Sequence, residues 1–199
     1  MAGQSHYPSF EVMNEQDEWD DHTQTIVTSR LKPNINLQFL TSKEAELVKR
    51  ISSLFVNDQT PEVLDFVVGH IDQTLYQSPG ESQRKADVPK APELIRAGLQ
   101  AIEQGVQEQY TSAFLELDMA EQKQYLQYIS ESIAKPQEVW DGIPQEALFK
   151  KLLNLTYESY CSHPKVWSEI GYAGPAYPRG YVRTQLGQLD PWEAQPEQW

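Results

Sequence analysis

The chain has 199 residues, which is enough for one domain with a sizeable hydrophobic core. Its 16 basic and 29 acidic residues give a formal net charge of -13, and a surface of that sign repels nucleic acid and anionic lipid. The sequence shows no run of about 18 apolar residues and no targeting segment, so we expect a cytoplasmic protein. The single cysteine, Cys161, excludes an internal disulfide and a cysteine-based zinc site.

The first 29 residues contain six acidic residues, no Lys or Arg, and several apolar side chains, among them Tyr7 and Trp19. A segment of this composition cannot form a core alone. Two interpretations are open: a disordered acidic tail, or an arm whose apolar residues are buried against another surface. We treat residues 1–40 as an extended acidic arm.

Helix signals begin at Thr41, which forms the pattern of a capping box with Glu44. Apolar residues then recur at helical spacing in five segments, bounded by prolines and capping residues. These segments are 42–56, Pro61 to Gln77, Pro92 to Val106, the stretch from the Asp118 cap to Pro136, and Pro144 to Tyr160. The fifth has the widest apolar face and is expected to be the most buried.

No segment alternates between apolar and polar residues with a period of two, so the sequence predicts an all-α fold. We expect a core of about five helices over residues 41–163. The stretch 78–92 holds three prolines and mixed charges, which is typical of a surface loop.

The character of the sequence changes between Tyr160 and Tyr181, where five aromatic residues, three prolines and three glycines occur. Pro and Gly suit irregular backbone and the rings supply burial, so we predict an ordered, extended strap within a C-terminal region 164–199. The strap covers its own helices, or it also meets a partner, since Tyr, Trp and Arg are enriched at interface hot spots. Residues 187–199 are expected to be loosely ordered.

The sequence contains no recognisable catalytic motif. Gly-x-Ser-x-Gly and glycine-rich nucleotide-binding patterns are absent, and His6, His22, His70 and His163 lack metal-ligand spacing. We expect Cys161 to be a buried thiol at a helix end and His70 to be a hydrogen-bonded histidine of the core or an interface. No catalytic, cofactor-binding or metal-binding residue is therefore assigned to this chain.

The C-terminal half carries residues that resemble the signature of the gluconate 2-dehydrogenase subunit 3 family. They are Leu155 to Pro164, Trp167, Ile170-Gly171-Tyr172, Gly174-Pro175 and Tyr177 to Tyr181. The earlier helices, including Phe66-x-x-x-His70-Ile71-Asp72, are similar to the family too, so the resemblance covers about 41–183. The chain departs from the family in lacking a Gly-Gly-Asn insert before Trp167, in having Cys161 where an aromatic residue is usual, and in lacking a twin-arginine signal.

The resemblance implies a non-catalytic small subunit that binds and stabilises a large FAD-dependent flavoprotein of the glucose-methanol-choline (GMC) type, which oxidises a sugar or sugar acid. FAD is then expected in the partner. Alternatives from the residues alone are a free-standing helical adaptor and an independent enzyme. The partner interface is expected to include Trp19, Tyr160, His163, Trp167, Tyr172, Tyr177, Arg179 and Tyr181, with Arg179 as its charged anchor.

Overall fold

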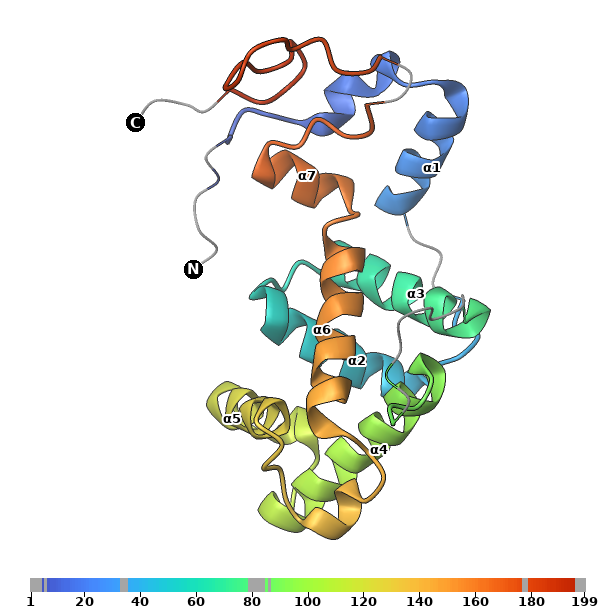
Figure 1. The fold of residues 1–199 in the computed structure, drawn as a ribbon, viewed down its shortest axis with the longest axis vertical. Coiled ribbons are helices and arrows are strands. Elements are labelled where there is room, and N and C mark those ends of the chain that lie inside the picture. The colour runs from blue at the N-terminus through green and yellow to red at the C-terminus, as the bar shows by residue number, and fades with distance from the viewer. Residues whose placement is uncertain are drawn as a thin grey trace.

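The computed structural model describes residues 5, 7–32, 36–78, 85, 87–176 and 179–195. In this part of the chain the regular structure consists of α-helices and short 3-10 helices, and no strand occurs, which confirms the predicted all-α fold. Figure 1 shows an elongated molecule with α2 to α6 forming its larger part and both terminal regions gathered at one end.

The five predicted core helices are all present. They are α2 (Ser42–Val56), α3 (Pro61–Gln77), α4 (Ala91–Tyr110), α5 (Met119–Ser130) and α6 (Gln145–Tyr160). The capping boxes of Thr41 with Glu44 and of Asp118 with Glu121 both form, which explains why two starts were predicted to the residue. Residues 79–84 and 86 of loop 78–92 lie outside the described residues.

Helix α6 is the centre of the core, because it packs against α2, α3, α4 and α5. Its Leu148 approaches α4 so closely that a Cβ on Gly98 would lie 2.2 Å from a Leu148 methyl carbon. One prediction for this region is wrong: α5 ends at Ser130, so Ile133 lies beyond the helix and is exposed.

The terminal regions contain helices that were not predicted. The 3-10 helix η1 (Val12–Glu18) and helix α1 (Asp21–Leu31) form in the N-terminal arm, and α7 (Pro164–Ile170) forms in the predicted irregular strap. The disordered-tail interpretation is therefore wrong for the described part of the arm. In the described residues from 171 onward, 171–176 and 179–195, the chain is irregular, as predicted for the strap.

Candidate partner interface

The arm and the strap share a small hydrophobic core of their own. Val12, Trp19 and Val27 from the arm are buried together with Trp167 of α7, and Phe10 and Met13 pack against them. Both η1 and α1 contact α7. The arm thus buries its apolar residues against the C-terminal region of the same chain. We call the arm and this C-terminal region together the arm–strap module.

Two glycines of the strap allow aromatic residues of the arm to approach its backbone. Gly171 and Gly174 have φ of +74° and +79°, a region that favours glycine. A Cβ on Gly171 would lie 2.6 Å from the Tyr7 ring, and one on Gly174 would lie 2.5 Å from the Trp19 ring. Larger residues at either position would therefore separate the arm from the strap.

Polar contacts add to this packing. The Ser168 hydroxyl accepts a hydrogen bond from the Val12 amide at 3.0 Å and lies 2.9 Å from a carboxylate oxygen of Glu11. The indole N–H of Trp167 donates to the carbonyl of Cys161 at 2.6 Å, which ties α7 to the end of α6. Trp167 therefore links the arm, the strap and the helical core.

Arg179 faces inward, which corrects the expectation of an outward-facing anchor. Its side chain is only 5% exposed, and its Nη1 lies 4.0 Å from a Glu15 carboxylate oxygen of the arm. Its Nη2 donates to the Ala173 carbonyl at 2.6 Å, and its guanidinium carbon lies 4.7 Å from the centroid of the Trp192 ring. Arg179 holds the strap to the arm and to the C-terminal loop.

The other predicted interface residues divide into two groups. Trp19, His163 and Trp167 are buried within the chain, whereas Tyr172 and Tyr181 are exposed. Tyr160 is half-buried and its hydroxyl donates to Asp58 at 3.0 Å, and burial together with this carboxylate raises the pKa of Tyr160. Tyr177 lies outside the described residues.

The prediction of a buried Cys161 thiol is wrong. Cys161 is the C-cap residue of α6, so its position at a helix end is as predicted, but the residue is exposed. The turn after α6 points its side chain outward, and its carbonyl serves as the acceptor for Trp167.

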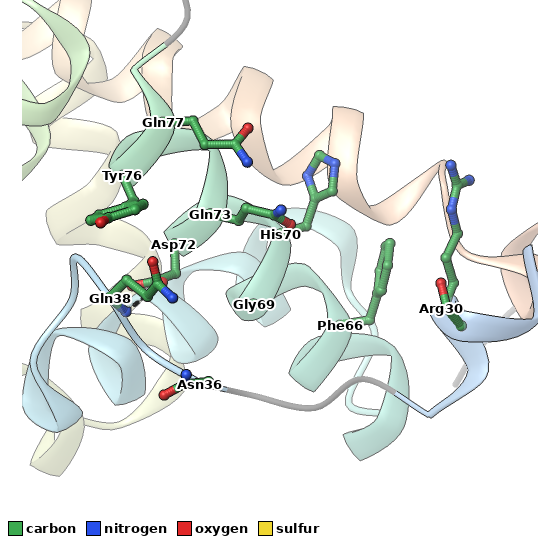
Figure 2. Close-up of a pocket in the computed structure, with 11 residues that line it drawn as sticks. Arg30, Asn36, Gln38, Phe66, Gly69, His70, Asp72, Gln73, Tyr76 and Gln77 are labelled. Carbon is green, nitrogen blue, oxygen red and sulfur yellow. Dashed lines mark hydrogen bonds between the residues drawn. The ribbon is translucent and has the colours of Figure 1, made fainter. Parts of the chain in front are cut away.

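A cavity of about 500 Å³ lies where the end of α1 and residues 36–38 face α3. Figure 2 shows its lining, which combines the rings of Phe66 and Tyr76 with several carboxamide side chains, among them Gln38 and Gln73. Arg30 borders the cavity, but its Nη1 donates to the Ser162 carbonyl at 2.8 Å and its guanidinium carbon lies 5.5 Å from the Trp167 ring centroid. Arg30 therefore fastens α1 to the α6–α7 turn.

His70 and Ser159 meet beside this cavity but do not form an activated nucleophile. The Ser159 hydroxyl donates to the Leu155 carbonyl at 2.7 Å, so it accepts from His70 Nδ1 at 2.9 Å. A base that activates serine must accept the hydroxyl proton instead. The prediction that His70 is a hydrogen-bonded core or interface histidine is confirmed, and the pair joins α3 to α6.

Asp72 is a buried carboxylate that the sequence marked only as part of the family resemblance. It is 2% exposed and accepts backbone N–H groups of Gln38, Phe39 and Leu40 at 2.7–3.0 Å. The available signal was its place on the apolar stripe of α3, between Val68 and Leu75, where a charged residue needs a partner. Asp72 fixes the segment that connects the arm to α2.

His163 occupies a structural position at the start of α7. It is the N-cap residue, 1% exposed, and its Nδ1 accepts the Lys165 amide at 3.2 Å. Burial lowers the pKa of both His163 and His70, and the nearby Arg30 guanidinium acts in the same direction. At His163, the Glu62 carboxylate raises the pKa and the Lys165 ammonium lowers it. At His70, the Glu158 carboxylate raises the pKa.

We expect the arm–strap module to loosen in mild acid. A folded-state pKa below the ordinary value of about 6.5 means that the undocked state binds more protons, so stability is lost as pH falls below about 6.5. The protection of α1 and α7 against hydrogen exchange, corrected for the intrinsic exchange rate at each pH, should therefore fall between about pH 6.5 and 5. His163→Asn keeps a capping acceptor without titrating and should flatten this dependence, whereas His22→Asn, at an exposed position of α1, should not. An unchanged pH profile in His163→Asn would contradict the assignment.

No cluster of three or more His, Cys, Asp or Glu suited to a metal ion occurs among the described residues. Within the same part of the chain, no helix is both long and apolar enough to cross a bilayer.

Comparison with known protein families identifies one relationship. The model of the family described as gluconate 2-dehydrogenase subunit 3 matches residues 42–174, which include helices α2 to α7 and the start of the strap. No curated protein and no solved structure matches the chain. Because the family model covers more than half of the sequence, the chain belongs to the gluconate 2-dehydrogenase subunit 3 family.

Proposed function

We propose that this chain is the non-catalytic small subunit of an FAD-dependent, GMC-type oxidoreductase that acts on a sugar or sugar acid. Its role is to bind the large flavoprotein subunit and to stabilise it. The observation that carries the proposal is membership of a family described as a subunit of a dehydrogenase, since such a description implies a partner subunit. FAD and the reacting groups then belong to the partner, and the cytoplasm stays the predicted compartment.

The geometry of the chain supports a binding role. Its Ser159–His70 pair is arranged for structure, and its buried carboxylate, Asp72, is saturated by backbone donors. Its terminal regions, by contrast, form a module that stands at one end of the helical core and leaves Tyr172 and Tyr181 exposed. Exposed aromatic residues on an ordered scaffold are characteristic of protein interfaces.

Co-expression with a large GMC-type flavoprotein, sought among the neighbouring genes, tests the proposal. The tagged chain should co-purify with a subunit that shows flavin absorbance, and the complex should reduce a dye when a sugar or sugar acid is supplied. The isolated chain should be colourless and should reduce no dye. Flavin retained by the isolated chain, or a flavoprotein that never co-purifies with it, would overturn the proposal.

A further inference from the structure

Helix α3 contains a glycine, Gly69, with open space where a side chain would lie. Apart from the adjoining backbone of its own helix, a Cβ on Gly69 would meet no described atom within 4 Å. The helical glycines Gly98 and Gly105 differ, because a Cβ there would lie 2.2 Å from a Leu148 atom and 2.1 Å from a Tyr125 atom. Glycine is the least favourable residue for a helix interior after proline. Since no described neighbour fills the space beside Gly69, this glycine leaves room for a group from outside the chain.

That space belongs to the cavity of about 500 Å³ between α3, the end of α1 and residues 36–38. Phe66, Gly69, Gln73 and Tyr76 follow one another at spacings of three, four and three residues, so they share one face of α3. Figure 2 shows this face from the Phe66 ring to the Tyr76 ring, with Gly69 between them. Pockets that hold small molecules have volumes of about 300–1,000 Å³, so this cavity is large enough for such a ligand.

The cavity offers hydrogen-bonding groups that the protein does not use. Four carboxamide side chains line it without a hydrogen bond to any described residue. They are those of Asn36, Gln38, Gln73 and Gln77. Each carboxamide has an oxygen that accepts and an NH₂ group that donates. Hydroxyl groups, which also donate and accept, match this lining, while the rings of Phe66 and Tyr76 supply apolar surface for C–H groups.

The charged groups at the cavity are already engaged. Among the described residues that line it, Arg30 and Asp72 carry opposite charges. Asp72 accepts three backbone N–H groups, and Arg30 donates to the Ser162 carbonyl. Burial lowers the pKa of His70, so its ring is neutral at pH 7; the Glu158 carboxylate acts in the opposite direction but is not part of the described lining. A charged ligand would find no free counter-charge here, so the lining suits a neutral molecule.

We propose that this cavity binds a neutral, hydroxyl-rich small molecule of the size of a monosaccharide. Its hydroxyl groups exchange hydrogen bonds with the carboxamides, and its C–H face lies against the rings of Phe66 and Tyr76. The inference goes beyond the proposed function and does not depend on it. Because α1 and α3 both border the cavity, a bound ligand also stabilises the contact between the arm–strap module and the helical core.

Isothermal titration of the full-length chain with D-glucose, D-galactose and D-mannose tests the inference. The chain is titrated alone because a flavoprotein that oxidises a sugar would contribute a site of its own. We expect saturable binding of at least one of the three. The uronic acid and the amino sugar with the same ring should bind more weakly by on the order of tenfold or more. Absence of saturable binding with all three sugars, or equal binding of a charged analogue, would overturn the inference.

Two substitutions at one position locate the bound sugar. Gly69→Leu fills the open space and should weaken binding by on the order of tenfold or more, whereas Gly69→Ala adds one methyl group and should change it less than about twofold. Both replace glycine with a better helix former, so circular dichroism melting should show neither variant to be less stable than the wild type. Equal sugar binding by the two variants would show that the sugar binds elsewhere and that the inference is wrong.

A second pair of variants tests the hydrogen-bonding groups. Gln73→Leu keeps a side chain of similar size without the carboxamide, and it should weaken sugar binding by roughly fivefold or more. Gln100→Leu, at an exposed position of α4, removes a carboxamide outside the cavity and should leave binding unchanged. Unchanged binding by Gln73→Leu would contradict the role of the carboxamides.

Co-purification with the flavoprotein separates this inference from the proposed function. Gly69→Leu should retain the flavoprotein as well as the wild-type chain does. If the wild-type chain binds no sugar and Gly69→Leu loses the flavoprotein, the cavity receives a segment of the partner, and the inference is wrong while the subunit role stands. If the wild-type chain binds a sugar but never a flavoprotein, the inference stands and the proposed function fails.

Discussion

Replacing Trp167 with alanine is expected to release the arm from the strap and to abolish capture of the flavoprotein. The substitution empties the centre of the small core that Val12, Trp19 and Val27 share with Trp167, and it removes the hydrogen bond to the Cys161 carbonyl. Removing a buried tryptophan costs roughly 3–5 kcal/mol. Hydrogen exchange should then show loss of protection in η1, α1 and α7, with protection of α2 to α6 largely retained.

Trp140→Ala provides the comparison, because Trp140 is 2% exposed and lies in the main core instead. Trp140→Ala should destabilise the helical core by a similar free energy, which is seen as a lower melting temperature. The arm and the strap should stay in contact. If Trp167→Ala leaves the arm protected from exchange, the shared core is not what holds the module together.

The second large effect is expected for Asp72→Ala. The change leaves the backbone N–H groups of Gln38, Phe39 and Leu40 without their acceptor in a buried position. Since hydrogen bonds to a charged group contribute about 1.5–3 kcal/mol each, we expect a loss of roughly 3 kcal/mol or more in the free energy of unfolding. Urea unfolding followed by circular dichroism measures it.

Asp65→Ala is the matched control, since Asp65 lies on the same helix and forms a half-exposed ion pair with Lys49. A surface pair of this kind contributes about 0–1 kcal/mol, so the control should be nearly neutral. Equal destabilisation by both substitutions would show that the contacts of Asp72 to residues 38–40 are not specially important.

The helical core was predictable because its signals are local. Thr41 with Glu44 and Asp118 with Glu121 are capping boxes, Pro61 begins α3, and apolar residues recur at helical spacing in between. The prediction failed where this spacing continued past the end of a helix, as at Ile133, which follows the last turn of α5.

The arm–strap module was not predictable in the same way. Helix α1 buries only Val27, so it has no apolar stripe, and α7 has only seven residues. What stabilises both is contact between segments that are far apart in the sequence, such as the Trp19 ring against Gly174. Composition could indicate that the arm needs a surface to cover and that the strap has aromatic residues to bury, but it could not show that each is the other's partner.

The candidate site shows the same limit. Aromatic residues and arginine drew attention to the strap, yet Trp167, His163 and Arg179 face inward, because the sequence does not specify which side of an irregular segment is covered. Exposure, which only the folded chain defines, separates these three residues from Tyr172 and Tyr181, whose side chains reach the surface.

Hydrogen exchange of the full-length chain, free and in complex with the flavoprotein, tests the central claim most directly. We expect new protection in residues 170–189, while exchange in α4 and α5 at the opposite end is unchanged. Protection confined to α4 and α5, with the strap exchanging as fast in the complex as in the free chain, would contradict the claim that this protein binds its partner through the arm–strap module.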